Sequence, residues 1–302
     1  MNSLLYTSLS RRRLLQSALL AAAFPLSVQA QPPRRVVSLF QGATDSLVAL
    51  GITPCGIVES WAEKPVYRYL RPALQHVPLV GLETQPSLED IVLLQPDLIV
   101  ASRFRHQEIA SLMRQIAPVV MTDDVFDFKR TLSALADSLQ QQAHAAALLQ
   151  QWQQRIAGLR SALQQRFAHQ WPLQVSVIEV RPDHIRSYVA GSFPGAVLSE
   201  LGFAWNDAAR QTRSPSLRFT NMESLPVLNA DIFFVLLRAQ SPAIERQYQR
   251  LQQHPLWQRM RAVQNGFVWQ VDSVPWNLSG GILGANLMLD DIERHLISEQ
   301  PV

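Results

Sequence analysis

The stretch from Gln142 to Phe167, QAHAAALLQQWQQRIAGLRSALQQRF, contains no proline and decides the fold. As one helix at 1.5 Å per residue it would be roughly 40 Å long, enough to cross a whole domain. The helical pattern extends from about Thr131 to His169, and segments of comparable size lie on either side. We therefore predict a rigid helix that connects two α/β lobes, with a long surface helix in a single domain as the alternative. Large apolar side chains recur mostly three or four positions apart, as on one helical face: Leu135, Leu139, Leu149, Trp152, Ile156, Leu159, Leu163 and Phe167.

The first thirty residues have the pattern of an export signal. Arg11-Arg12-Arg13 precede an apolar run from Ala18 to Leu26, and the run is followed by Val28-Gln29-Ala30, whose small residues suit a signal peptidase. The paired arginines favour the twin-arginine route, although the general secretion route accepts the same pattern. The run is too short for a permanent membrane anchor.

Charge and cysteine content agree with a soluble periplasmic protein. Residues 1–30 hold three arginines and no acid, so 24 basic and 24 acidic residues remain in the mature chain, and nothing favours nucleic-acid binding. Cys55 is the single cysteine, which excludes an intramolecular disulfide. We divide the chain into an export signal (1–30), a first lobe (31–140), a connecting helix (141–170) and a second lobe (171–302).

Short apolar runs alternate with helical segments in both lobes. In the first lobe, predicted strands cover 35–40, 55–58, 98–101 and 118–121, and a helix begins near Ser87. In the second lobe, strands are predicted at 173–180 and 267–271, with helices at 194–201 and from Ile282 to about Ile297. Such alternation predicts mainly parallel sheets, and ligands of such sheets bind at the carboxyl ends of the strands.

Arginines and aromatic residues follow these strands. The first lobe carries Phe40-Gln41, Trp61, Glu83 and Arg103-Phe104-Arg105 at strand ends. Guanidinium groups pair bidentately with carboxylates, so the two arginines suit an anionic ligand, or else a surface cluster paired with Glu108 or Asp123. In the second lobe, Arg181 and Arg186 flank a turn, and strand alternation places Arg186 and Tyr188 on one face. Trp276, in a loop rich in proline and glycine, is a further candidate for the pocket.

The two lobes also resemble each other in sequence. Leu88-Glu89 and Asp97 have counterparts at Met222-Glu223 and Asp231, each 134 positions later. The spacing predicts a duplicated unit. Glu89 and Glu223 would then occupy equivalent first turns, either as docking charges or as simple complements of the helix dipoles.

Together these motifs resemble the periplasmic binding proteins of ferric-siderophore and ferric-citrate ABC importers, whose two Rossmann-like lobes are joined by one long helix (class III). The resemblance covers both lobes: Gly81-Leu82, Gln85 to Glu89, Pro96 to Ile99, Arg181 to Arg186 with Tyr188, Ser192 to Gly195, and Pro255 to Gly281. It implies that Arg105, Arg181, Arg186 and Tyr188 line the ligand cleft. It also implies that Glu89 and Glu223 meet arginines of an inner-membrane permease dimer.

One residue departs from this family pattern. The hydroxamate-binding and ferric-citrate branches carry arginine where this chain has Glu83, which we expect to accept a hydrogen bond or to pair with Arg103. The arginines favour a polyanionic ligand such as a carboxylate-type or citrate-type ferric siderophore. Trp61, Phe104, Tyr188 and Trp276 would cover its carbon skeleton.

The expected function is therefore capture and delivery of a ferric chelate by a monomer, with no resident cofactor or protein metal site and only a small closure of the lobes. A related protein of the same class that binds haem or cobalamin is the first alternative, because His106, His184 and Tyr188 offer axial ligands. An exported α/β hydrolase is the second, although the chain lacks a Gly-x-Ser-x-Gly elbow, a phosphate loop and a dinucleotide fingerprint.

Overall fold

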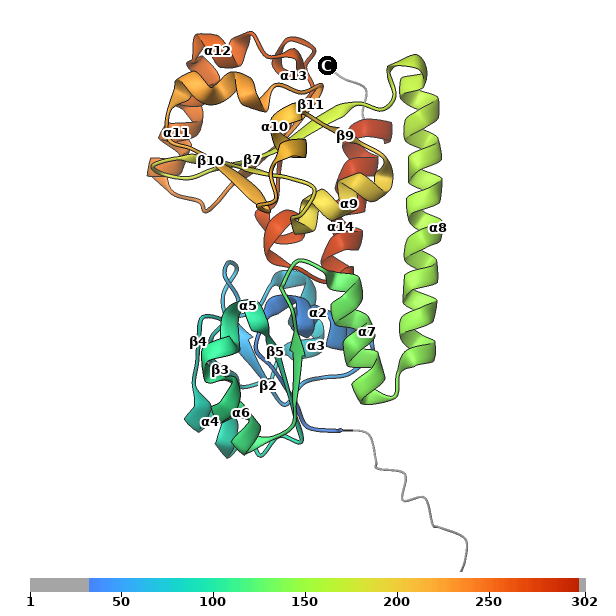
Figure 1. Ribbon diagram of the computed structural model, residues 1–302, viewed down its shortest axis with the longest axis vertical. Coiled ribbons are helices and arrows are strands. Elements are labelled where there is room, and N and C mark those ends of the chain that lie inside the picture. The colour runs from blue at the N-terminus through green and yellow to red at the C-terminus, as the bar shows by residue number, and fades with distance from the viewer. Residues whose placement is uncertain (1–32, 299–302) are drawn as a thin grey trace, which may run out of the picture. The chain divides into compact units, whose positions relative to one another are not determined.

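The sheet of the first lobe has strand order β4-β3-β2-β1-β5-β6. This lobe is the lower one in Figure 1. The computed structural model describes residues 33–298, so the predicted export signal at residues 1–30 lies outside the described part. Neighbouring strands are parallel except β3 and β4, which are antiparallel. The strands are β1 (Val36–Ser38), β2 (Gly56–Glu59), β3 (Leu79–Leu82), β4 (Gln85–Pro86), β5 (Leu98–Ser102) and β6 (Val119–Thr122).

Both faces of this sheet are buried. Successive side chains of a strand point to opposite faces, so Val36 joins one hydrophobic cluster and Val37 joins another. The helical elements of this lobe are α2 (Gln41–Ala49), η1 (Arg68–Leu70), α3 (Arg71–Leu74), α4 (Leu88–Leu93), α5 (Arg103–His106), η2 (Gln107–Ile109), α6 (Ala110–Ile116) and α7 (Phe128–Leu139).

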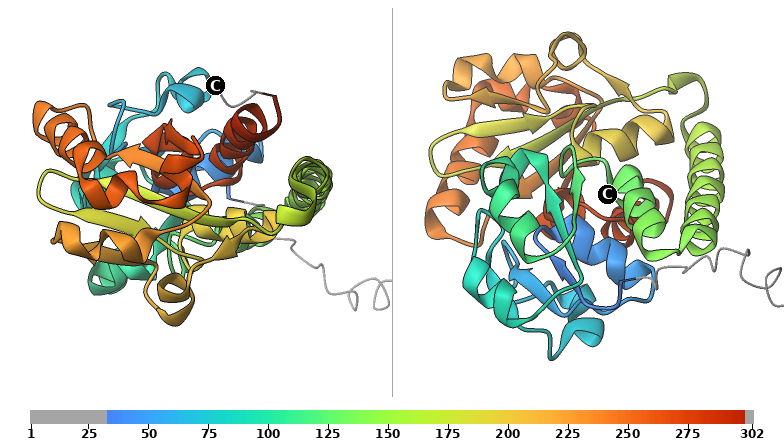
Figure 2. Two further views of the ribbon diagram at one scale, coloured as in Figure 1. Left: turned by 90° about the horizontal axis from the view of Figure 1, so that it is seen from above. Right: turned by 60° about the horizontal axis from the view of Figure 1, so that its bottom comes forward.

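The long helix α8 covers Gln142–Phe167 and runs alongside both lobes (Figures 1 and 2). Its buried side chains include Trp152, Ile156, Leu159, Leu163 and Phe167 of the predicted apolar face. Leu149 of that face is half-buried, and Ala145, which the prediction did not include, is buried. The helical pattern from about Thr131 is nevertheless broken, because Gln140 adopts a left-handed conformation (φ 57°) that ends α7. The segment before the break belongs to α7, which packs on α2 of the first lobe.

The second sheet has strand order β10-β8-β7-β11-β12, and β9 also pairs with β7. Strands β7, β9, β11 and β12 are parallel, whereas β8 and β10 run antiparallel to their neighbours. Both sheets are therefore mixed: the mainly parallel pairing that the sequence predicts is interrupted by the antiparallel pairs β3–β4, β7–β8 and β8–β10. The strands are β7 (Gln174–Val180), β8 (Ile185–Tyr188), β9 (Ala204–Trp205), β10 (Ser216–Phe219), β11 (Ile232–Leu237) and β12 (Val268–Val271).

Helices cover this second sheet and continue to the end of the described chain. The last of the α-helices, α14, packs against α2 of the first lobe as well as against its own lobe. The helical elements are η3 (Ala168–Gln170), α9 (Phe193–Leu201), α10 (Asp207–Gln211), η4 (Met222–Leu228), α11 (Pro242–Gln253), α12 (Pro255–Gln258), α13 (Arg261–Gln264), η5 (Val274–Leu278), α14 (Ile282–Glu293) and η6 (Arg294–Ser298).

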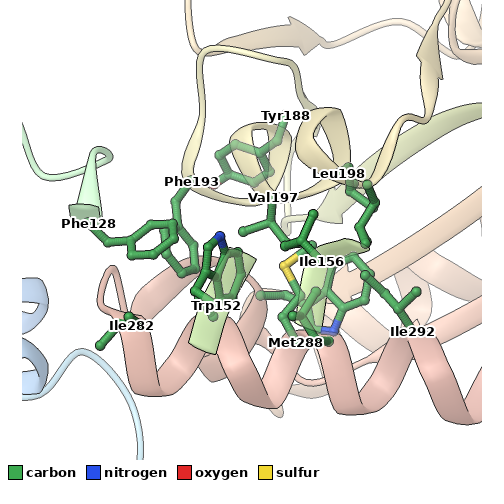
Figure 3. Packing of buried hydrophobic residues seen from close by; sticks show 14 of the residues in the cluster. Phe128, Trp152, Ile156, Tyr188, Phe193, Val197, Leu198, Ile282, Met288 and Ile292 are labelled. Carbon is green, nitrogen blue, oxygen red and sulfur yellow. The ribbon is translucent and has the colours of Figure 1, made fainter. Parts of the chain in front are cut away.

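One hydrophobic cluster joins the two lobes through α7, α8, α9 and α14 (Figure 3). Phe128 of the first lobe contacts Trp152 of α8 edge to face, with ring centroids 5.1 Å apart, and Phe193 of the second lobe at 5.8 Å. The Trp152 indole N–H donates to Glu200, which also pairs with Lys129. The predicted class, two α/β lobes connected by one long helix, is thereby confirmed. In the described part of the chain, no helix combines the length and apolar character needed to span a membrane.

Candidate functional site

A pocket of about 270 Å³ lies where the carboxyl ends of the central strands of both sheets meet. This is the position expected for a ligand of open α/β sheets. Both lobes contribute charged and aromatic residues to its wall, and the segment after β12 contributes the residues from Asn277 to Gly280. Its lining includes Phe40, Gln41, Trp61, Glu83, Phe104, Arg105, Arg181, Arg186, Tyr188, Arg238, Asn277 and Gly280.

Glu83 is the acidic residue in the first-lobe wall, directly after β3, and only 4% of it is exposed. Its Oε2 accepts hydrogen bonds from the indole N–H of Trp61 (3.1 Å) and the backbone N–H of Gln41 (3.2 Å). Its Oε1 accepts from Nε of Arg105 at 3.2 Å. Burial raises the pKa of this carboxyl, while the Arg105 charge and these donors act in the opposite direction. The predicted partner Arg103 is replaced by Arg105.

Arg105 is held on three sides. Besides the bond from Nε to Glu83, its guanidinium carbon lies 4.9 Å from the Phe104 ring centre and 5.6 Å from that of Trp61. Cations are attracted to the faces of such rings. The terminal nitrogens of Arg105 therefore remain available for a ligand, in an orientation that the neighbours fix.

His106 connects this arrangement to strand β5. The backbone N–H of Ser102 donates to Nδ1, so the ring proton lies on Nε2, which donates to the backbone carbonyl of Glu83 at 2.8 Å. Burial lowers the pKa of His106, which favours this neutral form. Both ring nitrogens are thus used within the protein, and His106 does not line the pocket.

Glu179 is the counterpart of Glu83 in the second lobe, because it is fully buried and accepts a hydrogen bond from an arginine of the pocket. Its Oε2 accepts from Nε of Arg181 at 2.6 Å and from the hydroxyl of Tyr188 at 3.1 Å. Its Oε1 lies 3.8 Å from a terminal nitrogen of Arg238. The Tyr188 hydroxyl accepts in turn from the side-chain amide of Asn277. Burial and the nearby Glu179 charge raise the pKa of Tyr188, so its hydroxyl stays protonated.

Arg186 differs from the other pocket arginines. It lies opposite Glu179 in the antiparallel pair of β7 and β8, and alternation brings it to the pocket together with Tyr188, as predicted. Within residues 33–298 it has no carboxylate partner, and its Nε is buried without a hydrogen-bond acceptor. An unsatisfied buried donor is costly, so this guanidinium is the group in the pocket most in need of an anion.

Two predicted site residues lie elsewhere. Arg103, at the start of α5, points to Gln107 and Asp123 rather than into the pocket. Trp276 is fully buried, because η5 turns its side chain inward to bond with Asp291 and to pack on Phe234, ring centres 4.3 Å apart. The expectation that Trp276 covers the ligand is therefore wrong for this structure.

Sequence reasoning missed Arg238 and Asn277. Arg238 directly follows the buried strand β11, just as Arg181 follows β7, so the rule that selected Arg181 applies equally to it. Asn277 is the neighbour of Trp276 in the same predicted loop. A second cavity of about 790 Å³ shares Trp61 and Arg238 with the pocket and therefore lies beside it.

Asp45, a buried residue of α2, connects the first lobe to the start of α14. Its carboxylate accepts the backbone N–H groups of Leu283 and Gly284, both at 2.9 Å, and the hydroxyl of Tyr69 at 2.7 Å. These amides form the first turn of α14, where a negative charge is favourable. Burial raises the pKa of Asp45 to about 6. In the residues that the structure describes, no cluster of three or more His, Cys, Asp or Glu side chains is suited to hold a metal ion.

Comparison with known proteins identifies the family. The model of the family described as "Periplasmic binding protein" matches residues 36–275. The chain belongs to that family. The prediction of a periplasmic binding protein instead of an enzyme is thereby confirmed.

Relatives of this periplasmic binding protein include siderophore-binding proteins. The achromobactin-binding periplasmic protein of Dickeya dadantii is 59% identical, over 94% of this chain and 95% of the relative. A probable siderophore-binding lipoprotein of Bacillus subtilis, YfiY, is 32% identical over 88% of this chain and 83% of its own length. The crystal structure of Staphylococcus aureus SirA with staphyloferrin B superimposes with a TM-score of 0.85 at 35% identity, covering 88% of this chain and 94% of that one.

Proposed function

We propose that this protein captures a ferric siderophore of the carboxylate type in the pocket between its lobes and delivers it to an inner-membrane ABC permease. The observation that carries the proposal is the convergence of Arg105, Arg181, Arg186 and Arg238 from both lobes on one pocket. Guanidinium groups bind carboxylates bidentately, and Trp61 and Phe104 supply apolar contact for a carbon skeleton. The similarity to an achromobactin-binding protein and to SirA in complex with staphyloferrin B supports a siderophore as the ligand.

The structure offers less to haem. Neither His106 nor His184 lines the pocket, and the Tyr188 hydroxyl is already bonded to Glu179 and Asn277. An axial ligand would have to break one of these arrangements.

Ferric achromobactin is the first ligand to test, by quenching of tryptophan fluorescence. We expect tight binding by the wild type and a loss of affinity of about 10- to 100-fold in Arg186→Gln, because a charge-assisted hydrogen bond is worth about 1.5–3 kcal/mol. Arg103→Gln is the matched control, since Arg103 lies outside the pocket. Equal affinity of wild type and Arg186→Gln would refute the proposed site.

Delivery would use one exposed glutamate in each lobe. Glu89 lies in the first turn of α4 and Glu223 in the first turn of η4, both exposed. Their N-caps, Ser87 and Asn221, accept backbone N–H groups of these turns. We propose that the two carboxylates pair with basic residues on the two subunits of the permease.

A further inference from the structure

Two buried carboxylates lie next to the pocket arginines, and an anionic ligand would repel both of them. Glu83 forms part of the pocket wall with only 4% of its surface exposed, and Glu179 is fully buried beside Arg181, which lines the pocket. Burying a charge costs free energy unless the charge is paired and hydrogen-bonded. We therefore expect each carboxylate to act through the arginine that it binds.

The arrangement is the same in both lobes. In the first lobe, one oxygen of Glu83 holds Nε of Arg105 at 3.2 Å. In the second lobe, one oxygen of Glu179 holds Nε of Arg181 at 2.6 Å. Each glutamate thus accepts a hydrogen bond from Nε of an arginine. The two terminal nitrogens of that arginine, which can bind a carboxylate bidentately, are left for another partner.

The two carboxylates also determine the charge that a ligand meets. Four arginines line the pocket, and the two buried glutamates reduce the formal charge of this group to two positive. Because the two carboxylates are themselves buried, their charges are screened less by water and salt than those of surface carboxylates.

We infer that Glu83 and Glu179 are specificity-determining residues, an inference that rests on the proposed function. They lower the positive charge of the pocket and orient the guanidinium groups of Arg105 and Arg181. The pocket therefore prefers moderately anionic ferric chelates over strongly anionic ones. Arg186 is the arginine whose charge neither glutamate offsets by direct contact. It would bind one carboxylate of the chelate, and the guanidinium groups held by the glutamates would bind the others.

The test replaces each glutamate by its neutral isostere and compares chelates of different charge. Wild type, Glu83→Gln and Glu179→Gln would be titrated with ferric achromobactin, a neutral ferric tris-hydroxamate and a ferric tris-catecholate that carries three negative charges. Glu108→Gln is the control, an exposed glutamate of the first lobe outside the pocket. Circular dichroism would verify that each variant is folded, and the two lobes give independent variants.

We expect both pocket variants to shift the ratio of affinities, tris-catecholate over tris-hydroxamate, upward by about tenfold, whatever happens to the absolute affinities. Binding of the anionic achromobactin chelate should also weaken more steeply with salt than in the wild type, since the pocket has gained one positive charge. A purely structural role would lower all affinities together and leave the ratio and the salt dependence unchanged, which would overturn the inference. Failure of the wild type to bind any anionic ferric chelate would instead refute the proposed function and the inference with it.

Discussion

Asp45 offers a test of the structure that needs no ligand. Its carboxylate is fully buried between α2 and the first turn of α14, and its pKa rises from 3.8 to about 6 because burial disfavours the charged form. A carboxyl whose pKa is higher in the folded than in the unfolded state binds more protons when folded between those two values. Its contribution to stability is therefore greatest below pH 3.8 and declines as the pH rises through 6.

The size of this effect follows from the shift. One pKa unit corresponds to 1.36 kcal/mol, so ionising Asp45 should reduce the free energy of unfolding by about 2–3 kcal/mol between pH 4 and pH 7. Asp45→Asn cannot ionise but keeps the shape of the side chain. We expect the free energy of unfolding of the wild type, minus that of the variant, to fall by this amount over that range.

Urea denaturation followed by tryptophan fluorescence at pH 4, 5, 6 and 7 would measure this difference. Asp137→Asn, an exposed change on α7, is the control for the loss of one carboxylate at a surface position. The variant also loses at least one of the three hydrogen bonds to Asp45, which lowers its stability by a similar amount at every pH. A difference between wild type and Asp45→Asn that does not change with pH would refute the reasoning.

Three further changes test the packing and the docking proposal. Gly42→Ala should lower the free energy of unfolding by about 1–3 kcal/mol and weaken ligand binding, because a Cβ at this position would clash with the backbone oxygen of Gly280 in the pocket wall. Thermal denaturation would measure the loss of stability, and ligand titration the loss of affinity. Gly158→Ala, in an open position of α8, should instead stabilise by about 0.5–1 kcal/mol in the same melt and leave affinity unchanged. Glu89→Ala combined with Glu223→Ala should abolish uptake by a reconstituted permease without altering the dissociation constant of the ferric chelate, and unchanged uptake would contradict the docking proposal.

Local signals were sufficient wherever a single element determines a residue's position. The period of apolar residues in α8 identified its buried face, and strand ends identified Arg181 and Arg105. The same rule would have given Arg238, had it been applied to β11. Alternation along β8 correctly placed Arg186 and Tyr188 on one side.

Long-range contacts explain what the sequence did not predict. The direction of Trp276 depends on Asp291 and Phe234, which belong to other elements, and no local pattern specifies it. The partner of Glu83 likewise depends on how α5 starts: Arg103 and Arg105 are two positions apart on this turn, so only one of them faces the pocket.

The sequence repeat has a physical counterpart in two aspartates. Asp97 accepts the backbone N–H groups of Arg34 and Arg35 just before β1, and Asp231 accepts that of Gln174 at the start of β7. Each aspartate directly precedes the parallel strand that pairs with β1 or β7. The two aspartates, 134 residues apart, thus make the same kind of hydrogen bond to the neighbouring strand in each lobe, and this bond fixes the strand register. The helix is not preserved to the same degree, because Glu223 lies in a 3₁₀ element that contains Pro226.

The way in which the lobes are joined explains why the pocket arginines need buried partners. A single hydrophobic cluster runs from the first lobe through α8 into the second, and Lys129 and Glu200 pair across the same junction. Large opening would expose this cluster to water, at a cost of about 25 cal/mol per Å² of apolar surface, so we expect only a small closure on binding. With little movement available to gather side chains around a chelate, the guanidinium groups must already be oriented before it arrives. Glu83 and Glu179 supply that orientation through the Nε bonds to Arg105 and Arg181.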